Sequence, residues 1–399
     1  MTEAVGGYAF EPAAPADLGL DPKRIDVARA ALHEQVASGR SPGLVAFVAR
    51  RGQCFLHEAV GARNPAGDPM LPDTLFRIMS ATKPLTAAVV MSLVEDGRIG
   101  LLQAVRDYLP EFPSDAGEGV LIHHLLTHTG GFDAPEWTGG FRRRVLEEAD
   151  EDARFGRDRV VNAFLGCMAE LKRVKPPGRG MLYANLNYEL LGEIVRRVTG
   201  SPSLGAVMQE RIFEPLGMQG AAMFPDAGLQ ARTVELSPES AFVALMRDRM
   251  GISLDDHRES DMAGGGLVCA PQDHATFQQM ILGRGSLGGR RVLSKASVEA
   301  MTTNQIPGVP DLAFGRKEAS WGYGFSVICK ERWPYFGGGL VPPGTATHAG
   351  SGGITHWIDF EHEIVGVLYE VVTAMSEMME PITAVGHRFQ DVITAAVVD

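Results

Sequence analysis

The residues best suited to chemistry are Ser80 and Lys83, which stand three positions apart in Ser80-Ala81-Thr82-Lys83. A serine hydroxyl is a poor nucleophile until an adjacent group accepts its proton. Residues three apart share one face of a helix, so the lysine amine could reach the hydroxyl without help from a loop. The amine can act as that base only where burial or a neighbouring positive charge lowers its pKa from about 10.4. The pair therefore predicts a nucleophile beside its base.

The surrounding residues predict a helix from Ser80 to about Asp96. Pro84 falls in the first turn, where a backbone N–H has no helical acceptor, and Gly97 fits a C-terminal cap. An ordinary amphipathic helix with a capping serine and a solvated lysine fits the same pair, so other parts of the chain must decide. Burial of the amine is favoured by the apolar side chains around it: Phe76, Ile78, Met79, Leu85, Ala88, Val89 and Val94.

A second candidate is Tyr183-Ala184-Asn185, which follows a Pro-Pro-Gly turn and precedes a helix-like run. A phenol with a lowered pKa can pass a proton, and a nearby amide can orient a substrate carbonyl. A packed tyrosine followed by an asparagine that caps the helix explains the same residues.

A third candidate is the glycine-rich segment 347–353, where a strand-like run meets His348, Ala349, Gly350 and Ser351. Small residues let a substrate approach the backbone, and a free N–H there could stabilise an oxyanion. A β-bulge or a turn is the alternative. The segment comes near the Gly-x-Ser-x-Gly elbow, but alanine replaces the first glycine and no parallel strand-helix pattern surrounds it, so we discount that motif.

Metal and cysteine chemistry have less support. His124 and His128 are four residues apart beside His123, but no His-Glu-x-x-His motif occurs and no carboxylate is obviously placed as a third ligand. We therefore expect a structural role for these histidines, and neither a metal nor another cofactor. The cysteines are scattered without paired spacing, which indicates reduced thiols: Cys54, Cys167, Cys269 and Cys329.

Composition excludes several classes of function. The 399 residues, 45% of them hydrophobic, can bury a large core in two domains or one elaborated domain. A net charge of −12 argues against nucleic acid or an anionic membrane as the main partner. Residues 1–10 lack the features of a signal peptide, and no stretch of about 18 apolar residues could span a bilayer, so we expect a cytoplasmic protein. The oligomeric state cannot be inferred.

Strand-like and helix-like segments are distributed unevenly along the chain. Strand-like runs lie near both ends, at 43–49, 54–60, 324–329, 345–348, 354–359 and 364–371. Helical periodicity dominates the middle, at 122–126, 160–171, 187–198, 204–213, 274–282 and 293–301. Helix-like runs also occupy 21–37 and 381–397. This pattern predicts an α+β fold: an antiparallel sheet flanked by terminal helices (residues 1–79 and 320–399) and an inserted, mostly helical domain (80–319).

Six blocks of the sequence, in order, resemble the class C β-lactamase-like superfamily of serine hydrolases, with its β-lactamase/transpeptidase-like fold, and within it the family VIII carboxylesterases. The resemblance spans roughly residues 47–371. The blocks are 75–83 (LFRIMSATK), 122–131 (IHHLLTHTGG), 183–185 with 188–192 (YAN and YELLG), 213–218 (FEPLGM), 263–267 (AGGGL) and 348–350 (HAG).

The resemblance implies an active site at the junction of the two domains. By motif match, Ser80 would be the acylated nucleophile and Lys83 its base. Tyr183 would pass the proton to the leaving group and later activate the deacylating water. The backbone N–H groups of Ser80 and Ser351 would form the oxyanion hole. Positions that would contact substrate are Asn185, His348, Ala349 and Gly350.

One departure from the family pattern bears on the substrate. True class C β-lactamases carry lysine where this chain has His348, and a neutral histidine supplies little positive charge for a substrate carboxylate. We therefore expect a carboxylesterase acting on small or short-acyl esters. The alternatives are a β-lactamase, a D-amino-acid peptidase or an acyltransferase with the same mechanism, or a silent binding protein on this scaffold. We expect the pocket walls to come from the poorly matched stretches 132–159 and 234–261.

Overall fold

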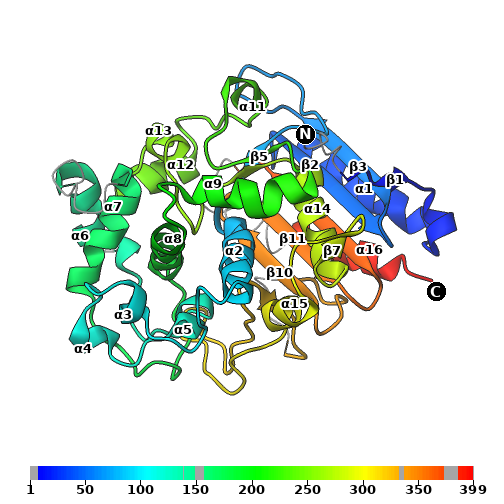
Figure 1. Ribbon diagram of the computed structural model, residues 1–399. Coiled ribbons are helices and arrows are strands. Elements are labelled where there is room, and N and C mark those ends of the chain that lie inside the picture. The colour runs from blue at the N-terminus through cyan, green and yellow to red at the C-terminus, as the bar shows by residue number, and fades with distance from the viewer. Residues whose placement is uncertain (1–7, 138, 149–156, 332–336, 373–384, 399) are drawn as a thin grey trace, which may run out of the picture.

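A seven-stranded sheet forms one part of the protein, seen at the right of Figure 1. The computed structural model describes residues 8–137, 139–148, 157–331, 337–372 and 385–398. The strand order is β1-β3-β2-β12-β11-β10-β9, and every neighbouring pair is antiparallel except β1 with β3. The strands are β1 (Glu11–Pro12), β2 (Gly43–Arg50), β3 (Gln53–Gly61), β9 (Ser326–Val327), β10 (Ala346–Gly350), β11 (Ile354–Asp359) and β12 (Ile364–Glu370).

Helices cover both faces of this sheet, which explains why its central strands are apolar throughout. Along β2, Leu44, Ala46 and Val48 belong to the apolar cluster that includes α1 (Pro22–Ala37) and α16 (Gly386–Ala395). The alternate residues of β2 belong to the main core, where α14 (Pro271–Leu282) packs on β2 and β12. Side chains alternate between the faces of a strand, so a strand covered on both faces needs apolar residues at every position. The predicted α+β fold, with a sheet built from both ends of the chain, is confirmed.

Helices dominate the remainder, seen at the left and centre of Figure 1. Two small sheets accompany them: β4 (Phe76–Arg77), β5 (Ala221–Ala222) and β6 (Val268–Cys269) in one, and β7 (Ser286–Leu287) and β8 (Arg290–Arg291) in the other. The α-helices are α2 (Lys83–Glu95), α3 (Val105–Tyr108), α4 (Ser114–Gly117), α5 (Ile122–Leu126), α6 (Gly139–Arg143), α7 (Arg159–Gly166), α8 (Asn185–Thr199), α9 (Leu204–Met208), α10 (Glu214–Leu216), α11 (Ala227–Ala231), α12 (Ala241–Leu245), α13 (Leu254–Arg258) and α15 (Lys295–Thr302).

Short helical turns complete the secondary structure. The turns of 3-10 helix are η1 (Pro15–Leu18), η2 (Met79–Thr82), η3 (Pro135–Trp137) and η6 (Cys167–Glu170). The π-helical turns are η4 (Arg144–Glu148), η7 (Gln209–Phe213) and η8 (Met246–Met250). Within the described ranges, no helix combines the length and the apolar composition needed to cross a bilayer.

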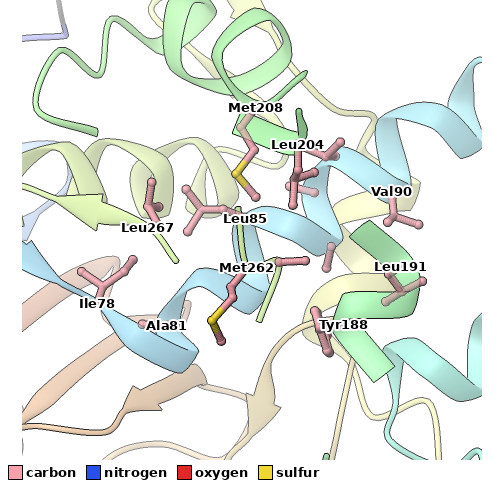
Figure 2. Packing of buried hydrophobic residues seen from close by; sticks show 14 of the residues in the cluster. Ile78, Ala81, Leu85, Val90, Tyr188, Leu191, Leu204, Met208, Met262 and Leu267 are labelled. Atoms are coloured by element: carbon pink, nitrogen blue, oxygen red, sulfur yellow. The ribbon is translucent and has the colours of Figure 1, made fainter. Parts of the chain in front are cut away.

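Helix α2 is the central element of the core. Its residues from Lys83 to Leu93 are all buried, and a helix surrounded by protein is apolar on every side. Figure 2 shows Leu85 and Val90 of α2 among side chains from α8 and α9 and from the segment between α13 and β6: Tyr188, Leu191, Leu204, Met208, Met262 and Leu267. The packing therefore holds the first turn of α2 rigidly, and with it the lysine that begins the helix.

Several predicted elements differ from those observed, two of them in the C-terminal part of the chain. The strand predicted at 324–329 is limited to the two residues of β9, because Gly324 has a φ of +93°, in the left-handed region that an extended strand does not use. The helix predicted at 381–397 is observed as α16, and residues 381–384 of that prediction lie outside the described residues. The predicted domain boundaries at 79/80 and 319/320 stay a prediction.

Candidate active site

Ser80 and Lys83 lie together at the junction of η2 and α2. The Lys83 Nζ is 3.0 Å from the Ser80 Oγ. The sequence predicted both residues on one regular α-helix, whereas Ser80 lies in the 3-10 turn and Lys83 starts the α-helix. Side chains three apart eclipse each other in a 3-10 turn, so the tighter geometry brings the two together more directly. Met79, just before the serine, has a φ of +49°, a strained conformation of the kind found at functional sites.

Lys83 is completely buried and has three hydrogen-bond acceptors. Besides the Ser80 hydroxyl, its Nζ donates to the Asn185 Oδ1 at 2.7 Å and to the Gly264 carbonyl at 2.8 Å. Burial lowers the pKa of Lys83 to about 7, although the charges of Glu189 and Glu136 act in the opposite direction. The amine is therefore close to equally protonated and neutral at pH 7, as a base for the serine requires.

Tyr183 completes the group, but its ionisation differs from the prediction. Its phenol is hydrogen-bonded with Ser80, and its ring centroid lies 5.0 Å from the Lys83 Nζ. We expected a lowered pKa; desolvation instead raises the pKa of Tyr183, and the bond to Ser80 only partly offsets this. The side chain keeps some exposed surface, but the tilted ring of His128 packs against it, with the ring centroids 4.4 Å apart, and covers one face. The phenol therefore stays protonated at neutral pH.

The glycine-rich segment borders the serine through the end of β10. A Cβ on Gly350 would lie 2.2 Å from the Ile78 carbonyl oxygen, so only glycine lets this strand approach the turn that carries Ser80. Ser351 follows in the exposed turn between β10 and β11. The Ser80 N–H is at the start of the 3-10 helix η2 and so has no acceptor within that helix. The segment that contains Ser351 therefore lies beside the turn that carries Ser80.

His348 is buried beside the group and is neutral. Its Nδ1 lies 2.7 Å from the Ala349 carbonyl, and its ring lies 6.2 Å from that of Tyr183 and 5.6 Å from that of Trp321. Burial, followed by the Lys83 charge, lowers the pKa of His348 to about 3. A positive charge is therefore absent from this side chain at neutral pH.

Sequence reasoning missed two buried carboxylates near Lys83. Glu136 and Glu189 are almost fully buried, and burial raises their pKa values to about 6 and about 7. Glu189 lies one helical turn after Asn185 on α8. A glutamate on the buried side of a helix is unusual and was the available signal, because residues four apart share a face. Glu136 lies in η3, and no sequence pattern pointed to it.

A cavity opens beside the serine turn and has a volume of about 800 Å³ including its mouth. Met79 and Ser351 contribute to its wall, so it adjoins the candidate site. The predicted stretch 234–261 does line it, whereas the described residues of 132–159 do not. Most of the lining is apolar and includes Phe76, Val234, Leu236, Phe242, Met246 and Ile252.

The histidines of the second sequence block have protein partners. The Nδ1 of His123 lies 3.0 Å from the Tyr323 hydroxyl, and the Nδ1 of His124 accepts from the Leu121 N–H at 3.0 Å. The Nδ1 of His128 lies 3.1 Å from the Asn187 amide nitrogen. Across the part of the chain that the structure describes, no cluster of three or more His, Cys, Asp or Glu residues is arranged to hold a metal ion.

Comparison with curated proteins gives relatives over most of the chain. Protein Rv1367c of Mycobacterium tuberculosis (strain ATCC 25618 / H37Rv) is 32% identical over 298 residues, which cover 71% of this chain and 72% of that protein. Esterase EstB of Burkholderia gladioli is 38% identical over 187 residues, which cover 45% of this chain and 46% of that esterase.

Comparison with solved structures gives the same fold. EstCE1, described as a hydrolase with promiscuous acyltransferase activity, aligns with a TM-score of 0.73 at 20% identity and covers 94% of this chain and 98% of that one. A family VIII carboxylesterase aligns with a TM-score of 0.70 at 21% identity, and the alignment covers 93% of this chain and 99% of that one.

The sequence model of the beta-lactamase family matches residues 28–377, which is most of the chain and includes every candidate site residue. The chain therefore belongs to the beta-lactamase family and is a serine hydrolase.

Proposed function

We propose that this protein is a carboxylesterase that hydrolyses small or short-acyl esters through an acyl-enzyme on Ser80. The observation that carries the proposal is the set of hydrogen bonds around Lys83. Two of its three partners, the Asn185 Oδ1 and the Gly264 carbonyl, can only accept. A neutral amine has two N–H groups and one lone pair. When both N–H groups donate to these fixed acceptors, the lone pair is directed at the Ser80 hydroxyl.

In the proposed acylation step, the Lys83 Nζ takes the proton of the Ser80 hydroxyl, and the serine Oγ bonds to the ester carbonyl carbon. The resulting oxyanion accepts hydrogen bonds from the Ser80 and Ser351 amides. Collapse of this intermediate breaks the ester C–O bond, and the Tyr183 phenol gives its proton to the departing alcohol. The Lys83 ammonium then restores the phenol proton. A protonated Tyr183 supports this role, because it can donate at neutral pH.

In the proposed deacylation step, water attacks the acyl-serine carbonyl. Tyr183 receives the water proton while it passes its own towards Lys83. The bond between the acyl carbon and the Ser80 Oγ then breaks, and the Lys83 ammonium gives its proton to that oxygen, which releases the carboxylic acid and returns the serine hydroxyl and the neutral amine. Two proton transfers in opposite directions through one phenol return the site to its starting state.

Two features support an uncharged ester as the substrate. His348 is neutral and buried, so it offers no cation for the carboxylate that a β-lactam carries. The neighbouring cavity is mostly apolar and suits an acyl group. Outside the residues that line this cavity, Asn185, Ala349 and Gly350 are proposed to contact the substrate near the reacting carbonyl. Rates over a series of p-nitrophenyl esters from acetate to decanoate should be highest at the short chains; a maximum at decanoate would contradict the short-acyl assignment.

The direct test is Ser80→Ala. This small change should leave folding intact, as checked by circular dichroism, and should reduce hydrolysis of p-nitrophenyl butyrate by about 10⁴-fold or more, in line with the loss of other serine nucleophiles. Turnover by the variant at the rate of the unmodified protein would rule out the proposal.

Acyl transfer to an alcohol is a second candidate, favoured by the description of the structural neighbour EstCE1. The same acyl-enzyme would be intercepted by an alcohol in place of water. Product analysis with a p-nitrophenyl ester and added alcohol should then show a new ester besides the free acid.

A further inference from the structure

Two buried carboxylates, those of Glu136 and Glu189, bind the backbone of the residues that accept hydrogen bonds from Lys83. The proposed reaction gives neither carboxylate a role. Glu136 accepts a hydrogen bond from the backbone N–H of Asn185 at 2.6 Å. Glu189 accepts from two successive backbone N–H groups, that of Gly264 being 2.9 Å away. Each carboxylate therefore fixes the chain segment that presents one acceptor to the amine.

Glu189 is linked to Lys83 more directly than Glu136 is, because a single residue, Gly264, is hydrogen-bonded to both Glu189 and Lys83. The N–H of Gly264 donates to Glu189, while the carbonyl of Gly264 accepts from Lys83 at 2.8 Å. A Cβ on Gly264 would lie 3.1 Å from the Glu189 Oε1, 3.4 Å from the Lys83 Nζ and 3.5 Å from the Asn185 Oδ1. Three functional groups thus converge on one glycine, and a methyl group there would press on the Glu189 carboxylate.

The segment that Glu189 holds is also fixed from the opposite side. The Ala263 N–H donates to Glu189 at 3.0 Å, and the Ala263 carbonyl accepts from the Thr86 hydroxyl at 2.6 Å. Thr86 lies on the same helix as Lys83, three residues later. Glu189 and Thr86 therefore clamp the segment against α2, and the position of the Gly264 carbonyl depends on both.

The negative charge of Glu189 raises the pKa of Lys83. Among the charges that affect the amine, that of Glu189 is the strongest and that of Glu136 the next, and both favour the ammonium form. Burial raises the pKa of Glu189 to about 7, whereas the Gly264 N–H, Arg196, the Ala263 N–H and Lys83 all favour its charged form. The other titratable groups that face Lys83 from the surrounding elements are Tyr183, Tyr188, His128 and His348.

We propose that Glu189 is a positioning residue for Lys83: its carboxylate fixes the Gly264 carbonyl that aims the amine at Ser80, and its negative charge stabilises the ammonium form between proton transfers. This inference rests on the proposed function, because it assumes that Lys83 is the base.

The test is Glu189→Gln, which removes the charge and turns one acceptor into a donor. Burial lowers the pKa of Lys83, and the charge of Glu189 is the strongest effect that raises it. Removal of that charge should therefore lower the pKa further. The acid limb of the kcat/KM profile for p-nitrophenyl butyrate should move to lower pH by roughly one unit. Misalignment of the amine should reduce kcat by about 10- to 100-fold. KM should change little, because Glu189 touches no substrate.

Glu193→Gln is the matched control. Glu193 lies one turn further along α8, is equally buried, and binds Arg157 and Arg197 at 2.8 Å each. It is not among the charges that act on Lys83. Its substitution should lower the melting temperature and leave the acid limb in place. Glu136→Gln should shift the acid limb in the same direction as Glu189→Gln, but by less.

Two further variants keep the proposal testable if Glu189→Gln does not fold. Glu189→Asp keeps the charge on a shorter side chain, so kcat should fall while the acid limb stays in place. Gly264→Ala pushes on the Glu189 carboxylate and should reduce kcat by at least tenfold. A folded Glu189→Gln with the acid limb and kcat of the unmodified protein would overturn the proposal. If Glu189→Gln does not fold, full activity in both other variants would overturn it.

Ser80→Ala, measured in parallel, separates the two levels of inference. If Ser80→Ala is inactive and Glu189→Gln behaves like the unmodified protein, only the role of Glu189 fails. If Ser80→Ala keeps full turnover, the proposed function fails first, and the role of Glu189 fails with it.

Discussion

The groups around Lys83 and around His274 are two deeply buried titratable clusters, but they are built differently. The His274 cluster lies between α14 and the sheet, where the rings of His274 and His356 are 4.3 Å apart and His274 contacts the Tyr369 hydroxyl. The Nε2 atoms of both histidines lack a hydrogen-bond partner among the described residues. Lys83, by contrast, has an acceptor for each of its protons.

The difference shows that a shifted pKa alone does not mark a reactive group. Burial lowers the pKa of His274 to about 3 and that of Lys83 to about 7, so both clusters are perturbed by the same cause. The Lys83 cluster combines that shift with a serine hydroxyl within hydrogen-bond distance and an adjoining cavity, whereas the His274 cluster is bonded only to core side chains. Substitutions in each cluster can test whether this distinction holds.

The largest effect is expected from Lys83→Met, which keeps much of the side-chain volume and removes the amine. Loss of the base should reduce kcat for p-nitrophenyl butyrate by about 10³-fold, the scale of general base catalysis. Circular dichroism should confirm that the variant folds. A kcat within tenfold of the unmodified protein would mean that Lys83 is not the base.

The pH dependence of the unmodified enzyme should reveal the same amine. The proposed base must be neutral, and the pKa of Lys83 is about 7, so kcat/KM should fall about tenfold per pH unit below that value. Above pH 7 the rate should level off, because the amine is already neutral. A rate independent of pH between 5 and 8 would remove Lys83 from the reaction.

The smallest effect on activity is expected from His356→Gln in the second cluster. His356 is bonded to Gln278 at 2.8 Å inside the core, so its loss should lower the free energy of unfolding by about 1 to 3 kcal/mol. Activity should stay within about threefold. A loss of activity comparable with that of Lys83→Met would abolish the distinction between the clusters.

The same variant allows a check of the pH dependence of stability. Burial lowers the pKa of His356 far below the value of about 6.5 in the unfolded chain. Below pH 6.5 the unfolded state therefore binds a proton that the folded state does not, so the stability that neutral His356 provides is lost as pH falls. The difference in unfolding free energy between the unmodified protein and His356→Gln should shrink by about 1 kcal/mol from pH 7 to 5.5, as measured by urea denaturation.

Much of the fold could be predicted because its signals are local. The strands around residues 47 and 367 are continuous apolar runs, and α1 begins with Asp21 and Pro22, so burial and capping are visible in the sequence. Ser80 and Lys83 could be paired because three residues separate them. Tyr183 and Ser351 stand out as candidates in their local sequence, but only the resemblance to a family groups them with Ser80, since no local pattern places them near the serine.

The other features of the candidate site could not be predicted, because they depend on contacts between distant parts of the chain. Glu189 reaches Lys83 through Gly264, and Glu136 acts through Asn185, so neither role follows from local spacing. The raised pKa of Tyr183 also has a tertiary cause, because the ring of His128 covers one face of the phenol. Desolvation of this kind cannot be read from the neighbours of a residue in sequence.

The central claim is that Ser80 becomes covalently acylated, and mass spectrometry after rapid quenching tests it most directly. With p-nitrophenyl butyrate, the protein should gain the mass of one butyryl group on the peptide that contains Ser80, at the rate of the p-nitrophenol burst. The Ser80→Ala variant should gain none. A burst of p-nitrophenol with the acyl group on another residue, or with no covalent adduct, would contradict the account.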